Sequence, residues 1–241
     1  MDTDALVLRP AAAADLGAVA EVHLQARTAA YPAFPRGIHP PGEVRAWVAG
    51  WDLGAREVWL AEAAGRVVGY LVLEGDWLDS LYVTPEAAGQ SVGGALLDLA
   101  KGLRPAGFCL WVFESNLPAR RFYDRRGLVA LERTDGSGNQ EHAPDIKMAW
   151  PGDRPLVFYR RLIDEVDTEL GDLLARRVAL TRAVQRHKAP AGPVTRDPDR
   201  EADIVATVTA RAPELGPDRV ARLVHLLITE SLAAAEEPRS W

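Results

Sequence analysis

The segment from residue 156 to residue 187 constrains the fold most strongly, because it carries one unbroken helical pattern. Its apolar residues recur at three- and four-residue spacings, at Leu162, Val166, Leu170, Leu173, Leu174 and Val178. This is the period of a helix and not that of a strand. Two shorter helical patterns follow, from Pro198 to about Arg211 and from Pro217 to about Ala235. Two short partners leave much of the apolar face of a helix of about 30 residues uncovered, so we predict an all-α, three-helix domain that forms a homodimer.

Charged residues on this first helix form a second pattern. Arg177 and Lys188 are eleven positions apart, which places them on nearly the same face, about 16 Å apart along the axis, with Val184 between them. Two cations that flank an apolar spot suit a small anion with an apolar body. Arg160 lies about 25 Å from Arg177 along the axis and roughly 100° round the helix. One helix cannot bring both arginines to one small ligand, so Arg160 is either a surface charge or part of a neighbouring subunit's site.

Proline and glycine mark the limits of the helical part. Residues 151–155 read Pro-Gly-Asp-Arg-Pro, which is typical of a short, stiff linker. Asp197 precedes Pro198, so an N-capping residue stands before a proline at the first helical position. We assign residues 1–150 to a first domain, 151–155 to the linker and 156–237 to the helical domain.

Composition and charge argue against several classes of protein. The chain of 241 residues is 48% hydrophobic, with a net charge of −6 and a pI near 5.4, which disfavours general binding to nucleic acids or anionic membranes. No apolar run approaches the roughly 18 residues of a membrane span, and the acidic start Met1-Asp2-Thr3-Asp4 is unlike a signal peptide. The single Cys109 lies in an apolar run, which excludes an internal disulfide framework or a zinc cluster. We expect a cytoplasmic protein with small-molecule substrates and no metal.

The first 150 residues alternate between strand-like and helical patterns. Strand-like runs lie at 6–9, 58–62, 66–74, 77–83, 108–113, 128–134 and 146–150. Helical patterns lie at 14–26, 43–49, 92–103 and 118–126. This order predicts a mixed α/β domain.

A junction rich in small residues separates the strand at 77–83 from the helix at 92–103. It reads Gln90-Ser91-Val92-Gly93-Gly94-Ala95. Small residues at a helix N-terminus let backbone N–H groups approach an anion at the positive end of the helix dipole. A glycine pair before a helix also fits a simple tight turn, so the surrounding sequence has to decide between the two.

The surrounding sequence resembles the GNAT acetyltransferases. Gln-x-x-Gly-x-Ala follows an apolar strand, and the second half of the family pattern is present in register, at Trp111 to Asn116, Ala119, Phe122-Tyr123 and Gly127-Leu128. The resemblance implies transfer of an acetyl group from acetyl-CoA to an amine. It implies that the backbone of Gln90, Ser91, Val92, Gly93, Gly94 and Ala95 holds the pyrophosphate, and that Leu81, Tyr82 and Val83 pair with the pantetheine arm. Asn116 would contact the cofactor.

Tyr123 matches the family tyrosine that protonates the departing thiolate. A phenol with a pKa of about 10 suits this general-acid role. The alternative is an ordinary half-buried aromatic residue.

The sequence offers several candidates for the general base and for residues that contact the acceptor. Asp79 could face the cleft from its strand or be a solvated carboxylate, and His23 and His39 could shape the acceptor pocket or be structural. Tyr31, Phe34 and His39 suggest an acceptor with an aromatic or apolar body. The polar loop at 134–142 could lie at the rim of the same pocket.

The helical part resembles the AroQ-type chorismate mutase domain, an intertwined all-helical dimer, from about Leu156 to Ala235. The resemblance implies that the other subunit donates Arg160, in agreement with the helix geometry. The remaining matches are Arg177 and Arg200 in the site of the same subunit, Lys188 at the ether oxygen, Asp197 and Glu201 as the acidic pair, and Ser231 near a substrate carboxylate. Val184, which lies between Arg177 and Lys188 on the helix, would be a further substrate contact.

The chemistry of the chorismate mutase reaction explains why these residue types would be needed. Conversion of chorismate to prephenate is a Claisen rearrangement that needs no nucleophile and no cofactor. The enzyme holds a flexible dianion in its compact conformer and stabilises charge on the ether oxygen. The planar guanidinium of arginine can bind both oxygens of a carboxylate, and the ammonium group of lysine suits a single oxygen. A solvated helix face is the ordinary alternative, but one of only three lysines stands where the pattern requires one.

One position departs from the family pattern. Ala235 stands where a Gln or Glu usually donates to the ether oxygen, and Glu236 follows one residue later. We therefore predict a bifunctional protein, an N-acetyltransferase fused to a chorismate mutase, and keep two alternatives. The helical part could be a dimerisation module that senses chorismate, or it could act on a chorismate relative such as aminodeoxychorismate or isochorismate.

Overall fold

The computed structural model describes residues 6–188 and 197–236. Contacts divide the chain into two compact units, residues 1–160 and 161–241. The helix α5 (Pro155–Lys188) begins in the first unit and continues in the second. Among the described residues, no helix combines the length and the apolar character that crossing a membrane requires.

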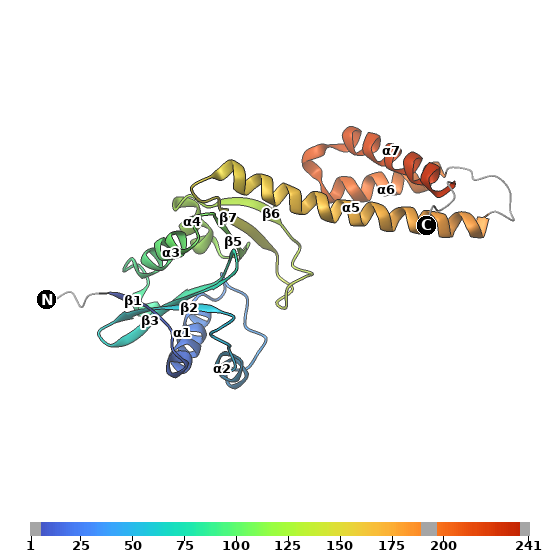
Figure 1. Ribbon diagram of the computed structural model, residues 1–241. Coiled ribbons are helices and arrows are strands. Elements are labelled where there is room, and N and C mark those ends of the chain that lie inside the picture. Colours follow the sequence, from blue (N-terminus) through green and yellow to red (C-terminus); the bar gives the residue numbers. More distant parts are fainter. Residues whose placement is uncertain (1–5, 189–196, 237–241) are drawn as a thin grey trace. The chain divides into compact units, whose positions relative to one another are not determined.

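A seven-stranded sheet forms the centre of the first unit, in the order β1-β2-β3-β4-β5-β7-β6 (Figure 1). Its strands are β1 (Val7–Pro10), β2 (Glu57–Ala63), β3 (Arg66–Glu74), β4 (Trp77–Val83), β5 (Phe108–Phe113), β6 (Val129–Arg133) and β7 (Asp145–Trp150). Neighbouring strands are antiparallel except β4 and β5, which are parallel. The mixed sheet confirms the predicted α/β architecture.

Helices cover both faces of this sheet. One face carries α1 (Leu16–Ala29) and α2 (Pro41–Ala49), and the other carries α3 (Val92–Leu103) and α4 (Leu117–Arg125) (Figure 1). Strand β3 serves both cores, because successive side chains of a strand point to opposite faces. Its residues 70 and 72 pack into the core with α1 and α2, whereas residues 71 and 73 pack into the core with α3 and α4.

The second unit is helical, as the sequence pattern predicts. It contains the rest of α5, α6 (Pro198–Arg211) and α7 (Pro217–Glu236). The carboxylate of Asp197 caps α6 by accepting a hydrogen bond of 3.0 Å from the backbone N–H of Arg200. Facing apolar residues of α6 and α7 form the small core, which contains Ile204, Val205, Val220, Val224, Ile228 and Leu232.

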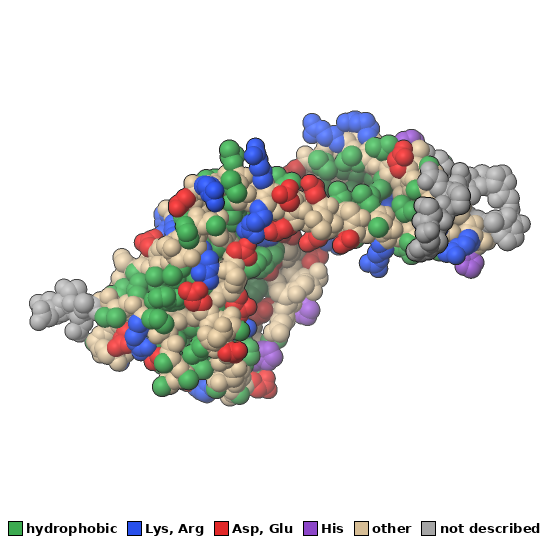
Figure 2. Space-filling view, in the orientation of Figure 1, with side chains coloured by type: hydrophobic (Ala, Val, Ile, Leu, Met, Phe, Trp, Pro, Cys, Tyr) green, Lys and Arg blue, Asp and Glu red, His purple; other side chains and the backbone are tan. Residues whose placement is uncertain are grey.

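Much of the apolar surface of α5 is uncovered. Its residues Ile163, Val166, Leu170, Leu173 and Leu180 each expose between 50% and 62% of their surface, and hydrophobic side chains are visible on this unit in Figure 2. An apolar stripe of this size normally faces a core or a partner. Dimerisation through this unit stays a prediction.

Several element boundaries differ from the sequence prediction by one to three residues, and two of these differences have a clear local reason. The strand predicted at 128–134 is shorter, because Leu128 closes the turn after α4, where its N–H donates to the carbonyl oxygen of Tyr123 at 3.1 Å. Helix α2 begins at Pro41, two residues before the predicted start, because a proline fits the first position of a helix.

The segment predicted as a linker is packed against the first unit. The backbone N–H of Asp153 donates to the carbonyl oxygen of Pro105 at 2.9 Å. Phe158, in the first turn of α5, exposes only 2% of its surface and lies over Gly107. A methyl group at Gly107 would lie 2.5 Å from the Phe158 ring. The two compact units divide after Arg160, and the linker at 151–155 stays a prediction.

Replacing Phe158 should therefore destabilise the first unit. We expect Phe158→Ala to lower the free energy of unfolding by about 3–5 kcal/mol, because a buried aromatic ring leaves a cavity. Six of the seven tryptophans lie within residues 1–160, so tryptophan fluorescence during urea unfolding reports this unit. Val157→Ala is the control, since Val157 is 55% exposed. Equal losses in both variants would contradict the packing role of Phe158.

Candidate functional site

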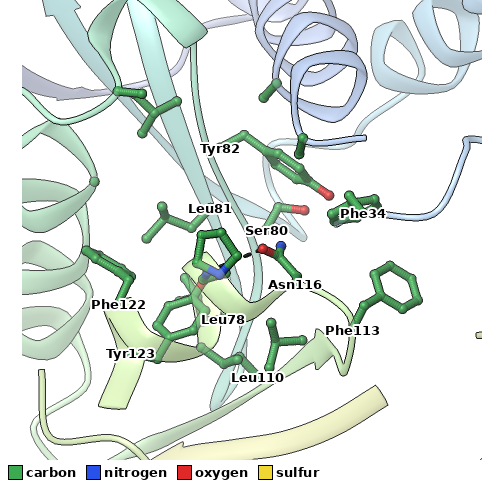
Figure 3. Close-up of a pocket in the computed structure, with 18 of the residues that line it drawn as sticks. Phe34, Leu78, Ser80, Leu81, Tyr82, Leu110, Phe113, Asn116, Phe122 and Tyr123 are labelled. Carbon is green, nitrogen blue, oxygen red and sulfur yellow. Dashed lines mark hydrogen bonds between the residues drawn. The ribbon is translucent and has the colours of Figure 1, made fainter. Parts of the chain in front are cut away.

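A cavity of about 700 Å³ opens where β4 and β5 part. The two strands pair only at Trp77 and Cys109. Beyond this point β4 and β5 line opposite walls of the cavity, with Leu78 to Val83 on one side and Leu110 to Phe113 on the other (Figure 3). On this side β4 has no neighbouring strand, so its backbone can pair with an extended ligand.

The predicted β4 residues Leu81, Tyr82 and Val83 all line this cavity. All three side chains are half-buried. Burial raises the pKa of the Tyr82 hydroxyl. The three residues therefore present a neutral, largely apolar wall to a ligand.

The N-terminal turn of α3 forms another part of the wall. Ser91, Gly93 and Gly94 line the cavity, and Ser91 takes a left-handed backbone conformation (φ 66°) as the N-cap of the helix. The first N–H groups of a helix have no partner within the helix. The N–H of Ala95 is the first that is engaged, since it donates to the carbonyl oxygen of Ser91 at 3.0 Å.

The other predicted residues of this turn do not line the cavity. Val92 belongs to the core. The Gln90 side chain donates to the carbonyl oxygen of Glu86 at 2.7 Å. Of the six residues predicted to hold a pyrophosphate with their backbone, Ser91, Gly93 and Gly94 thus line the cavity, and the pyrophosphate site stays a prediction.

Arg126 also lines the cavity, although it was not among the site residues predicted from the sequence. Its guanidinium lies where a side chain on Gly94 would be, because a methyl group there would approach Nη2 to 2.1 Å. Nη1 also donates to the Gly94 carbonyl oxygen at 3.3 Å and to the Asp98 carboxylate at 3.1 Å. The position four residues after Phe122 could have revealed it, because residues four apart share a helix face and the cation lies 5.3 Å from that ring.

Asn116 and Tyr123 of α4 also face the cavity (Figure 3). Asn116 caps α4, and its Oδ1 accepts a hydrogen bond of 3.2 Å from the N–H of Ala119. Its amide nitrogen is the group left for a ligand. Tyr123 is 8% exposed, and burial raises the pKa of its hydroxyl well above the ordinary value. Tyr123 is therefore a protonated phenol at neutral pH.

In the helical unit, Arg177 and Ser231 meet across two helices. Nη1 of Arg177 on α5 donates to Oγ of Ser231 on α7 at 2.6 Å and to the Leu227 carbonyl oxygen at 3.2 Å. Ser231 exposes only 2% of its surface. The Ser231 hydroxyl donates its proton to the Leu227 carbonyl oxygen at 2.5 Å. The remaining N–H groups of the guanidinium are therefore the donors that could bind a carboxylate here.

Two sequence families match the two units. The profile of the Acetyltransferase (GNAT) domain matches residues 54–128, and the profile of Chorismate mutase type II matches residues 159–236. The chain joins a GNAT domain to a chorismate mutase domain.

Two named N-acetyltransferases are similar in sequence to the GNAT domain. Peptidyl-lysine N-acetyltransferase YiaC of Escherichia coli (strain K12) is 29% identical over 94 residues, which cover 39% of this chain and 62% of that protein. Peptidyl-lysine N-acetyltransferase YjaB of Salmonella typhimurium is 30% identical over 84 residues, which cover 35% of this chain and 57% of that protein. The chain thus spans somewhat more than half the length of these two relatives. The solution structure of apo-form YjaB from Escherichia coli has the same fold, with a TM-score of 0.52 at 21% identity over 61% of this chain and 99% of that chain.

A second pocket of about 900 Å³ adjoins the cavity in the GNAT domain. Its lining includes His23, Tyr31, His39 and Trp47 together with Glu141 from the polar loop. Arg27 and Glu141 line both spaces, and their ion pair of 2.5 Å stands between them. Apart from these two residues, the described walls of the two spaces are separate.

The acceptor residues suggested by the sequence are divided between the two spaces. Tyr31 and His39 line the second pocket, whereas Phe34 lines the first cavity. Asp79 also lines the first cavity. His39 is an exposed residue whose Nδ1 lies 3.0 Å from the Glu43 carboxylate.

The remaining described residues that were predicted for the chorismate mutase site are all more exposed than Ser231. Asp197 and Arg200 are exposed at the start of α6, Glu201 is half-buried, and Val184 is 49% exposed. Lys188 ends α5, but its side chain, like that of Glu236, lies outside the described residues. Arg160 is exposed and is the last residue of the first compact unit.

Two further polar groups of α5 were not predicted from the sequence to belong to a site. Nε of Arg182 and Oε1 of Gln185 are buried without a hydrogen-bond partner in the described part of the chain. Nη2 of Arg182 donates to the carbonyl oxygen of Ala234 at 2.6 Å. Buried polar atoms are normally paired, so this end of the domain has hydrogen-bonding capacity for a ligand or a second chain.

Proposed function

We propose that the protein is bifunctional, with an acetyl-CoA-dependent N-acetyltransferase activity and a chorismate mutase activity. The observation that supports the first is the cavity between β4 and β5, which the α3 N-terminus and Tyr123 both line. The observation that supports the second is the contact of Arg177 with Ser231 between two facing helices.

The cavity residues fit acetyl-CoA in charge and shape. The unpaired side of β4 suits the amides of an extended pantetheine arm. The free N–H groups of residues 92 to 94 and the guanidinium of Arg126 suit the pyrophosphate. Asn116 supplies an amide donor in the same wall. The bound thioester would supply the acetyl group.

In the transfer reaction, the amine nitrogen forms a bond to the acetyl carbon and the carbon–sulfur bond breaks. Tyr123 would give its hydroxyl proton to the sulfur as that bond breaks. The phenol is protonated at neutral pH and lies in the wall of the cavity, so it can supply this proton. The amine must also lose a proton, so a base has to act on the acceptor side.

The acceptor that we favour is a primary amine. Both relatives described above are named as peptidyl-lysine N-acetyltransferases, which supports a lysine side chain. An aryl amine derived from chorismate is the second candidate, because the aromatic side chains of Tyr31 and Trp47 line the second pocket and the same chain carries the chorismate mutase domain.

In the mutase reaction, Arg177 and Ser231 would bind one carboxylate of chorismate and hold the compact conformer. Lys188 would stabilise the charge that grows on the ether oxygen, and Glu201 would accept a hydrogen bond from the ring hydroxyl. Asp197, Arg200 and Val184 would complete the pocket, and the partner subunit would donate Arg160. No cofactor takes part in this rearrangement. The exposed apolar face of α5 supports a homodimer in which this site is completed.

Two assays on the full chain test this proposal. Prephenate formation is followed by the loss of chorismate, and acetyl transfer by thiol release from acetyl-CoA with a peptide that carries one lysine. Turnover in both assays is expected. Chorismate binding without conversion would instead favour a sensing module, and turnover of isochorismate or aminodeoxychorismate alone would favour a chorismate relative as the substrate.

Restoring the missing donor should increase the mutase rate. Ala235 lies in the last turn of α7 and is half-buried. We expect Ala235→Gln to raise kcat for prephenate formation about tenfold, because one hydrogen bond to a developing oxyanion is worth a factor of this order or more. Ala233→Gln, at an exposed position on the same helix, is the control. A rate unchanged by Ala235→Gln would show that another group already fills this role.

A further inference from the structure

An ion pair marks the border between the cavity of the GNAT domain and its second pocket. Nη2 of Arg27 on α1 donates to Oε1 of Glu141 at 2.5 Å, and both residues line both spaces. Their side chains expose only 20% and 14% of their surface. Because this pair is largely shielded from water, its charges interact more strongly than those of an ordinary surface ion pair.

Aromatic contacts place the pair at the opening between β4 and β5. The Arg27 guanidinium lies 4.4 Å from the centre of the Phe34 ring. That ring lies near Tyr82 at the end of β4 and near Phe113 at the end of β5, with centroids 6.3 Å and 4.8 Å away (Figure 3). The pair therefore lies at the end of the cavity where the two strands have parted. An acceptor that comes from the second pocket has to pass it.

The loop between β6 and β7 fixes the position of Glu141. The side-chain amide of Asn139 donates to the Ala143 carbonyl oxygen at 2.7 Å and to Oδ2 of Asp145 at 3.0 Å. Its Oδ1 accepts a hydrogen bond of 3.2 Å from the Ala143 N–H. Asp145 is itself buried, with 9% of its surface exposed. These bonds close the loop on both sides of Glu141 and hold it on the sheet.

The backbone of this loop is constrained as well. His142, directly after Glu141, has a φ of 48°, which is uncommon for a residue other than glycine. Gly136 (φ 79°) lies so close to Ala143 that a methyl group on it would lie 2.3 Å from the Ala143 backbone. Constrained backbone of this kind is often found where a protein positions a functional group. The loop is thus shaped to present the Glu141 carboxylate.

Arg27 is bound less completely than other arginines of the domain. Its Nε is buried and has no hydrogen-bond partner in the part of the chain that the structure describes. Arg9, by contrast, donates to Glu62 and to both carboxylate oxygens of Asp15. A buried donor without a partner costs free energy. Another cation can therefore replace Arg27 at Glu141, and the second pocket of about 900 Å³ has room for the displaced side chain.

We propose that Glu141 recognises the ammonium group of the acetyl acceptor, and that Arg27 occupies this position while no acceptor is bound. This inference rests on the proposed acetyl transfer. An alkyl ammonium group supplies the same charge as the guanidinium and has three N–H donors for the carboxylate. A lysine side chain carries this charge at neutral pH, whereas an aryl amine does not. Glu141 therefore selects lysine over an aryl amine.

The two members of the pair should have opposite effects on acceptor binding. In acetyl transfer to the single-lysine peptide, we expect Glu141→Gln to raise KM for the peptide about 10- to 100-fold, because a hydrogen bond to a charged group is lost. Arg27→Met should lower this KM about three- to tenfold, because the ammonium no longer competes with the guanidinium. KM for acetyl-CoA should change little in both variants. A pair that only ties α1 to the loop would raise the peptide KM in both variants, and this result would overturn the proposal.

Two controls separate charge recognition from a distorted loop. Glu21→Gln and Arg45→Met break a more exposed ion pair of 2.6 Å between α1 and α2, and neither should change KM for the peptide. The second control is a peptide of the same sequence with an aminooxy group in place of the lysine amine, because this group is uncharged at neutral pH. Glu141→Gln should leave KM for the aminooxy peptide within about twofold. An equal rise in KM for both peptides would overturn the recognition role of Glu141.

Binding measured without transfer distinguishes this inference from the proposed activity. Fluorescence anisotropy of the full chain with CoA compares the lysine peptide with one that carries norleucine, which lacks the ammonium group. We expect wild type to bind the lysine peptide about tenfold more tightly, and Glu141→Gln to bind both equally. This preference without any transfer would count against the acetyltransferase activity alone. Transfer by wild type without this preference, or binding of neither peptide, would overturn the role of Glu141.

Discussion

An equal mixture of Arg160→Ala and Arg177→Ala chains should regain about a quarter of the wild-type rate of prephenate formation. Each variant alone should be about a thousandfold slower than wild type, because each loses one cation that binds or stabilises negative charge. In a mixed dimer, one site would combine the intact Arg177 of one chain with the intact Arg160 of the other. The second site would carry both substitutions. Half of the dimers would be mixed, and half of their sites would be active.

The physical basis of this prediction is the length of α5. The helix is continuous from residue 155 to residue 188, which puts Arg160 and Arg177 about 25 Å apart along its axis. A ligand the size of chorismate cannot contact both from one chain. Arg160 can therefore act at this site only across a dimer.

The experiment requires exchange of subunits, so the two variants are mixed, unfolded in urea and refolded together. The wild-type chain treated in the same way sets the full rate. Arg177→Ala refolded alone and Arg161→Ala, which removes an exposed neighbour, are the controls. No recovery in the mixture would mean that Arg160 and Arg177 do not serve one site in trans.

The sequence patterns predicted the helical domain well, for reasons that lie in particular residues. The apolar period around Leu162 to Val178 predicted a helix over 156–187, and α5 spans Pro155–Lys188. Asp197-Pro198 predicted the start of α6, where the Asp197 carboxylate caps the Arg200 N–H. These features are local, because periodicity and capping depend on residues a few positions apart.

Features that depend on distant residues were not predictable in the same way. The contact of the Arg126 guanidinium with Gly94 joins the end of α4 to the start of α3, and the two residues are 32 positions apart. The hydrogen bond between His23 and Tyr70 spans 47 positions. The sequence singled out His23 as a chemically capable residue, but the packing of α1 against β3 decides that its partner is Tyr70.

The second large effect concerns Tyr123, and we expect Tyr123→Phe to lower kcat for acetyl transfer about 100- to 1000-fold. The variant keeps the ring in the core and removes only the hydroxyl, so KM for acetyl-CoA should change little. Burial raises the pKa of this hydroxyl, which keeps Tyr123 in the protonated, proton-donating form as the pH rises. The wild-type rate should therefore show no alkaline decline caused by Tyr123 up to about pH 10, the ordinary tyrosine pKa.

A change of leaving group separates proton donation from packing. A thiolate that is already stable needs no proton from Tyr123, so an acetyl thioester of an acidic aromatic thiol should reduce the difference between Tyr123→Phe and wild type to about tenfold or less. Tyr159→Phe, with an unchanged rate for both thioesters, is the control. If Tyr123→Phe were equally slow with both thioesters, the hydroxyl would act in positioning. The raised pKa would then be only a consequence of burial in the core beside β5.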